Sequence, residues 1–188
     1  MDNIHPIDVS DAMIIRGAKM DTEMNRVHGK YIAKCYDAKG NLKWEDEFDN
    51  LVTDVGARFL LDTTFGGSAN STYFLGLTAA TPTPANADTM VSHGGWTEAT
   101  GWSTPASNAR ATITWSAAAS RAKAISSAAS FTASGALTVG GCFIVTGSGA
   151  VATNGNTGGT LYSVGAFSGG NKTLALNDTI QVSYSTSA

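Results

Sequence analysis

Residues 136–167, with the sequence ALTVGGCFIVTGSGAVATNGNTGGTLYSVGAF, decide the fold class of this chain. Short apolar runs lie at 136–139, 142–145 and 160–167, and glycine-rich links such as 155–159 separate them. Apolar runs of about four to eight residues between turn-forming links are typical of β-strands. This stretch therefore predicts successive short strands joined by tight connections.

The same pattern continues on both sides of this stretch. Strand-like runs also lie at 73–77, 111–115 and 178–184. Many short strands with glycine and serine turns are typical of an antiparallel β-sandwich or jelly roll, whereas strands alternating with helices would indicate a parallel sheet. No repeat of fixed period is visible, which argues against a propeller or a solenoid. We therefore expect a single all-β domain over 29–188, preceded by an extended arm over 1–28.

The start of this domain, residues 29–49, predicts a hairpin with one solvated face. A Gly-Asn pair at 40–41 supplies the positive φ that hairpin turns need. In the return strand Trp44 and Phe48 fall on one side, and most of the acidic residues fall on the other. Asp46 falls on the apolar side, so we expect it to have a polar partner or to lie at the edge of the sheet.

One short helix is expected after the hairpin, at about 53–64. Thr53 or Asn50 can cap its first turn, and Asp54 suits the positive N-terminal end of the helix dipole. The glycines at 66–67 end the helical pattern.

Within the arm, residues 1–24 have no clean helical or strand period, although they contain apolar residues. We expect it either to pack back on its own domain or to lie on a neighbouring subunit. In the second case Ile4, Pro6, Ile14 and Ile15 are the expected contact residues.

A long loop over residues 78–109 interrupts the strands and contains Trp96 and Trp102. Loops of this length inside compact domains are commonly functional or ordered by a partner. The two tryptophans could cap the core, contact another subunit or stack on a sugar. His93 precedes a Gly-Gly-Trp sequence in the same loop, and we expect it to hydrogen-bond within the loop.

The charged residues are concentrated at one end of the chain. Residues 1–62 hold 20 of the 27 charged side chains, and residues 63–188 hold seven. The surface of an isolated domain normally carries about a quarter to a third charged residues. A body this poor in charge is typical of a protein that docks in an assembly. The seven are Asp88, Glu98, Arg110, Arg121, Lys123, Lys172 and Asp178.

Composition also restricts the partners and the compartment. The net charge of −3 argues against a nucleic-acid partner, which would require a basic stripe. The chain has no apolar run of about 18 residues and no signal-peptide pattern, so we expect no membrane partner and assembly in a cytoplasm. A reducing compartment favours buried thiols at Cys35 and Cys142 over a disulfide between them.

Residues 147–152 match a loose G-x-G-x-x-A pattern after a strand. A dinucleotide site needs a helix to begin there and an acidic residue about 20 positions later. The sequence continues as a loop, and the next acidic residue is Asp178. We therefore expect a flexible hairpin connection and no cofactor.

Neither a metal site nor a catalytic centre is indicated by the sequence. The acidic residues at 45–49 alternate between two faces of a strand, whereas a calcium loop needs converging oxygens. A glycan hydrolase would need a convergent carboxylate pair, and residues 63–188 offer three acidic residues for it. We expect no metal and no enzyme activity. The histidines, which have no metal-ligand spacing, are His5, His28 and His93.

Several short phrases of the sequence point to one family. They are Trp44-Glu45-Asp46 leading into Asn50-Leu51-Val52-Thr53 and Gly56, YFLGL at 73–77, ADTM at 87–90, SHGGWTE at 92–98 and GTLYS at 159–163. Over about residues 40–188 the chain resembles small structural proteins of tailed bacteriophages. The resemblance implies a place in the virion, after assembly in the host cytoplasm, with the major capsid protein and copies of the chain itself, as a dimer or trimer, as partners.

The resemblance and the charge distribution together lead us to expect a capsid decoration or cement protein, which stabilises the head by binding across major capsid protein subunits. The expected contacts are the apolar residues of the arm together with Trp96 and Trp102. The alternative is a tail, neck or fibre structural protein, in which the two tryptophans would form a glycan or receptor site.

Overall fold

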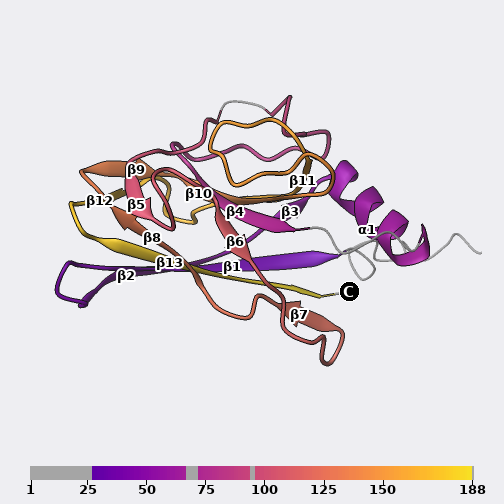
Figure 1. Ribbon diagram of the computed structural model, residues 1–188. Helices are drawn as coiled ribbons and strands as arrows, with labels where there is room; N and C mark the ends of the chain where they lie inside the picture. Colours follow the sequence, from indigo (N-terminus) through magenta and orange to yellow (C-terminus); the bar gives the residue numbers. More distant parts are fainter. Residues whose placement is uncertain (1–26, 67–71, 94–95, 188) are drawn as a thin grey trace, which may run out of the picture.

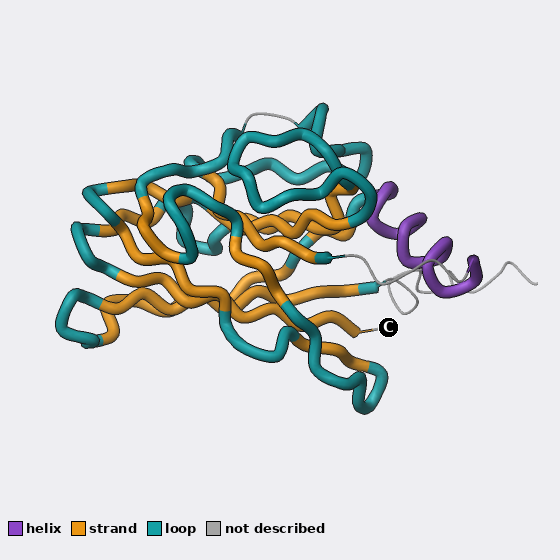
Figure 2. The backbone as a smooth tube through the Cα atoms, in the orientation of Figure 1, coloured by secondary structure: helices purple, strands orange, loops and turns teal. Residues whose placement is uncertain are grey.

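The computed structural model describes residues 27–66, 72–93 and 96–187. These residues form antiparallel sheets with a single helix, α1 (Asp54–Gly66), so the predicted all-β sandwich class is confirmed. Two larger sheets lie one over the other, and α1 projects from one end of the pair (Figure 1). A tube drawn along the backbone shows how much of the chain above the second sheet is loop (Figure 2).

The first sheet has six strands. Its strand order is β2-β1-β13-β8-β5, with β7 also paired to β13. Strand β13 is therefore central, and β2 is an edge strand. The strands of this sheet are β1 (His28–Tyr36), β2 (Leu42–Asp49), β5 (Trp102–Thr104), β7 (Ala122–Ala124), β8 (Ala129–Ala133) and β13 (Thr179–Ser187).

The second sheet has five strands in the order β3-β11-β10-β4-β6. A separate two-stranded ribbon pairs β12 with β9. The strands are β3 (Leu51–Val52), β4 (Tyr73–Thr78), β6 (Ala111–Ile113), β9 (Leu137–Val139), β10 (Gly141–Thr146), β11 (Thr160–Ala166) and β12 (Lys172–Leu174).

The second sheet is buried on both faces, and this explains the apolar runs in the sequence. All six residues of β10 are buried, including adjacent residues that point to opposite faces. One face, with Ile144, packs against the first sheet. The other face, with Phe143 and Val145, packs beneath loop residues Met90 and Trp96. A strand that is buried on both faces has a continuous apolar run in its sequence, whereas a strand with one exposed face alternates apolar and polar residues.

In the hairpin formed by β1 and β2, the prediction that Asp46 has a polar partner or lies at the edge of the sheet is confirmed. This carboxylate is buried and accepts a hydrogen bond from the Ser168 hydroxyl. The Lys172 ammonium lies 3.5 Å from its other oxygen. Because β2 is also an edge strand, Asp46 has both a partner and a position at the edge of the sheet.

Helix α1 begins one residue after the expected position and ends two residues later. Thr53 is its cap, because its hydroxyl accepts a hydrogen bond from the Gly56 amide at 3.1 Å. Asn50, the other candidate, instead donates to the Tyr184 hydroxyl at 3.0 Å. The helix packs on β11 through Gly56, where a β-carbon would lie 2.4 Å from the Tyr162 carbonyl oxygen.

Five short strands were not expected from the sequence: β3, β5, β7, β8 and β12. Strand β3 has only two residues, and the residues of the other four are largely alanine, serine and threonine, so those four have little hydrophobic contrast between their two faces. Strand β5 lies inside the expected long loop, where Trp102 packs edge-on against Phe131 of β8 with ring centroids 5.3 Å apart. The aromatic contact thus places part of that loop in the first sheet.

The two cysteines are free and buried, as the sequence predicted. Burial raises the pKa of the Cys35 thiol to about 11, and burial raises the pKa of Cys142 well above its ordinary value. Both side chains are therefore neutral thiols at neutral pH. Among the described residues, no helix has the length and apolar character needed to cross a membrane.

Candidate interaction surface

The four arm residues expected to make contacts, Ile4, Pro6, Ile14 and Ile15, lie outside the described residues. The other two, Trp96 and Trp102, are described, and both are buried inside the chain. Trp102 lies in the core between the sheets, and its indole nitrogen donates to the Ala109 carbonyl at 2.9 Å. Trp96 lies over the second sheet, with its ring 5.1 Å from that of Phe143.

The two tryptophans thus occupy separate hydrophobic clusters and are not brought together. Each has the environment of a core residue. For either indole to touch a sugar or another subunit, the loop that carries it would have to move. The His93 ring stacks on Trp96 at a centroid distance of 3.8 Å, and no hydrogen-bond partner for its Nδ1 atom is found within the described part of the chain.

The long loop is fastened to the body by a buried ion pair that the sequence did not predict. The Arg110 guanidinium donates through Nε to Glu98 at 3.1 Å and through Nη2 to the other carboxylate oxygen. It also donates to the carbonyls of Val151 and Asn156 at 3.0 and 2.6 Å. Its carbon Cζ lies 5.5 Å from the centre of the Phe143 ring. The Arg110 side chain is fully buried, so this one residue joins loop 78–109 to the glycine-rich segment 147–159.

The other charges of residues 63–188 are also satisfied within the chain, with two exceptions. Lys43 donates to the buried Asp178, and Lys172 pairs with Asp46. Although burial alone would raise the pKa of Asp178, its hydrogen bond with Lys43 brings the pKa below the ordinary value. Asp88 is buried and accepts a hydrogen bond from the Ala85 amide at 2.9 Å. The two exposed exceptions are Arg121 and Lys123.

The outer face of the first sheet is nearly neutral as well. On β1 and β2 two cross-strand ion pairs join Lys30 to Glu47 at 2.5 Å and Lys34 to Glu45 at 3.2 Å. These acidic residues lie on an exposed strand face, as the sequence predicted. The central strand β13 contributes uncharged polar residues to this face; the exposed or half-buried ones are Thr179, Gln181, Ser183, Ser185 and Ser187.

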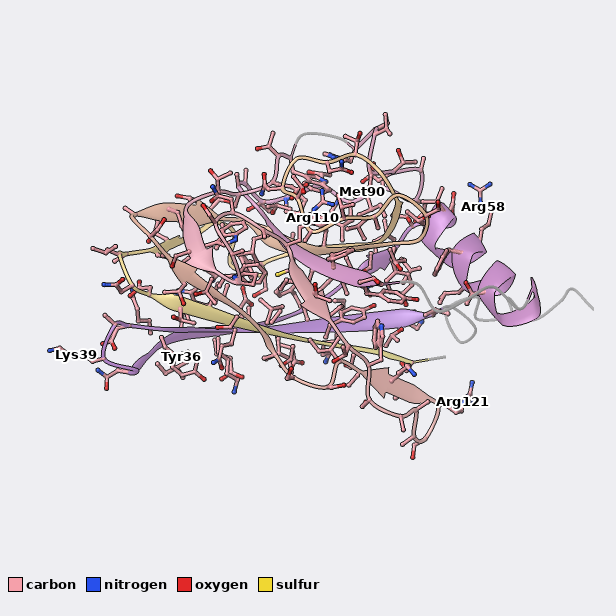
Figure 3. All side chains as sticks on the ribbon, viewed as in Figure 1. Tyr36, Lys39, Arg58, Met90, Arg110 and Arg121 are labelled. Carbon is pink, nitrogen blue, oxygen red and sulfur yellow. The ribbon has the colours of Figure 1, made fainter. Side chains whose placement is uncertain are left out.

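Open depressions interrupt the surface of the described residues, and two of them lie beside loops or turns. One of about 460 Å³ lies between loops 78–109 and 147–159 and contains no charged or aromatic residue in its lining. The second, of about 410 Å³, lies beside the β1–β2 turn and is lined by Tyr36, Asp37, Ala38, Gly40, Asn177, Thr179 and Gln181. Tyr36 points away from the sheet (Figure 3).

The candidate chemical motifs do not form a reactive site. Residues 147–152 form a turn, so no helix begins where a dinucleotide phosphate would need one. Within the described ranges, no group of His, Cys, Asp and Glu side chains is arranged to hold a metal ion. Compared with family models, with curated proteins and with solved structures, the chain matches none of them. The functional argument therefore rests on the residues and their geometry.

Proposed function

We propose that this chain is a bacteriophage virion structural protein, and specifically a capsid decoration or cement protein that binds across major capsid protein subunits. The observation that supports the proposal is that the chain buries or pairs most charged side chains of residues 63–188 within itself. Five of the seven charged residues in 63–188 are buried or paired within the chain. The exposed surface of residues 63–188 therefore consists mostly of hydroxyl, amide and small apolar groups.

Such a surface is suited to permanent contact with other proteins. The centre of a protein interface is normally depleted of charged residues, because each would lose its hydration on binding. A protein that binds the assembled shell more tightly than its separate subunits stabilises the shell by mass action. The body needs no reactive group for this role, and it acts as many equivalent copies, as a dimer or trimer, on a repeating lattice.

The arm is the second element of the proposal. An extended segment that becomes ordered on a neighbouring subunit covers a large area, although its ordering has an entropic cost. The buried hydrophobic residues that the structure describes lie between Tyr31 and Tyr184.

Deletion of residues 2–24 is therefore expected to abolish binding to heads while the body stays folded. The measurement is co-sedimentation of the full-length and truncated chains with phage heads that lack the protein. Far-ultraviolet circular dichroism of the truncated chain provides the folding control. Normal binding by a folded truncated chain would contradict the role of the arm.

A second candidate function, a tail, neck or fibre protein with a glycan site, is favoured by the depression at Tyr36. Neutral sugars bind shallow sites in which an aromatic ring lies beside amides and hydroxyls. Tyr36 is half-buried and has no ring partner within the described residues, whereas Trp96 and Trp102 are buried. The side chains of Asn177 and Gln181 provide nearby amides.

If this function holds, Tyr36→Ala weakens binding to bacterial surface polysaccharides by about tenfold or more, which corresponds to about 1.4 kcal/mol. Tyr36→Phe keeps the ring and is the matched control, so it should retain most of the affinity. The measurement is a polysaccharide array followed by calorimetric titration of any binder. An array without binders would remove this function from consideration.

A further inference from the structure

A narrow β-hairpin, residues 114–126, extends from the first sheet and is called the finger here (Figure 1). It contains β7, whose residues pair with the last residues of β13. Its base is fixed by Trp115, whose ring lies 5.3 Å from that of Tyr73 and 5.9 Å from that of Tyr184. Beyond the base its residues are mostly exposed alanine and serine, so the finger contributes little to the core.

The residues at the tip of the finger are unfavourable for the type of turn that they form. Ala119 and Ala122 exchange two backbone hydrogen bonds of 2.9 Å across a two-residue turn. The two central residues, Ser120 and Arg121, have φ values of 49° and 64°. Asn-Gly is strongly preferred in such turns, because a side chain with a β-carbon is disfavoured at positive φ. The presence of arginine at this position suggests a role other than forming the turn.

The finger also carries the two exposed cations of the charge-poor body, Arg121 and Lys123. Neither pairs with a carboxylate of the described residues. Arg121 points outward from the tip of the finger (Figure 3). Arg121 lies in the turn and Lys123 lies in β7, so both cations are at the end of the finger.

Carboxylates of opposite charge lie at the other edge of the first sheet. Glu45, Glu47 and Asp49 are exposed on the edge strand β2, also at intervals of two residues. Asp49 has no ion pair among the described residues, and Glu45 and Glu47 have exposed, solvent-screened pairs with lysines of β1. Two cations of one copy and three carboxylates of another can thus face one another.

We propose that the finger of one copy docks on β2 of a second copy, with Arg121 and Lys123 facing Glu45, Glu47 and Asp49. The contact joins two different surfaces of the chain, and the proposal includes its closure, either as a small ring or as a dimer in which the contact is made twice. The proposal does not depend on the virion role, because it concerns the purified chain alone. A nucleic acid is disfavoured as the occupant, because two cations on a chain of net charge −3 do not form a basic stripe.

The test measures the molar mass of the full chain by light scattering after size exclusion. The wild-type chain is expected to be a dimer or trimer, and R121E/K123E is expected to have the mass of one chain, 19.3 kDa. Lys39→Glu changes an exposed cation on a different hairpin and should leave the oligomer intact. A monomeric wild-type chain, or an R121E/K123E variant that keeps the wild-type mass, would overturn the proposal.

A charge exchange provides a second test that misfolding cannot imitate. E45K/E47K alone should also be monomeric, and mixing it with R121E/K123E should give a mixed oligomer, because each variant restores the charge that the other has lost. Failure of two folded variants to associate on mixing would count against the contact. S120N/R121G should raise the melting temperature and yet weaken association about tenfold, because it improves the turn and removes one cation.

Discussion

Replacing Arg110 with alanine is expected to lower the free energy of unfolding by about 3–5 kcal/mol, the range found when one partner of a buried ion pair is removed. The Glu98 carboxylate would remain in a largely buried site without its cation. The carbonyls of Val151 and Asn156 would each lose a charged donor. Unfolding free energies of small domains are about 5–15 kcal/mol, so this single change would remove a large fraction of the stability.

Urea unfolding of the wild-type and Arg110→Ala chains measures this loss directly. The matched control replaces both partners, as Arg110→Met with Glu98→Leu, and leaves no uncompensated charge. Apolar replacement of a whole buried pair is often neutral, so the double variant should recover most of the stability. If Arg110→Ala cost less than about 1 kcal/mol, the ion pair would be no more than a surface pair in energetic terms.

The second large effect is expected for Gly140→Ala. A β-carbon at this position would lie 1.9 Å from the Ala80 carbonyl carbon and 2.0 Å from the Thr81 amide nitrogen. Both are backbone atoms, so the clash cannot be relieved by rotating a side chain. The Gly140 amide also donates a hydrogen bond to the Thr78 carbonyl at 2.8 Å. We expect a loss of about 3 kcal/mol, at the upper end of the usual range for overpacking.

Gly135→Ala is the matched control, because a β-carbon there would have no heavy atom within 4 Å. It should change the melting temperature little, whereas Gly140→Ala should lower it by about 6–12 °C for a domain of this size. Equal melting temperatures for the two variants would contradict the close approach of Gly140, the residue before β10, to the start of loop 78–109.

The fold class could be predicted from the sequence because several strands have a clear hydrophobic pattern. The apolar runs of β10 and β11 and the hairpin of β1 and β2 are visible without a structure. Strands β5 and β8 are not, because alanine, serine and threonine do not distinguish a buried strand from a loop. Their position depends on tertiary contacts such as that between Trp102 and Phe131.

The candidate surface was only partly predictable for a similar reason. The scarcity of charge after residue 62 is a property of composition, so it could be read directly. The partners of those charges could not be predicted, because Arg110 donates hydrogen bonds to carbonyls 41 and 46 residues further along the chain. The rarity of charge in this region was the one available signal for Arg110. The contacts assigned to Ile4, Pro6, Ile14 and Ile15 stay predictions.

The central claim, a decoration role on the phage head, is tested most directly by the copy number of this chain per particle. Quantitative mass spectrometry of purified virions would measure it against the major capsid protein. The proposal predicts on the order of one copy per one or a few capsid subunits, as mass action on a repeating lattice requires. A handful to a few dozen copies would place the protein in the tail or neck, and its absence from the particle would contradict both roles.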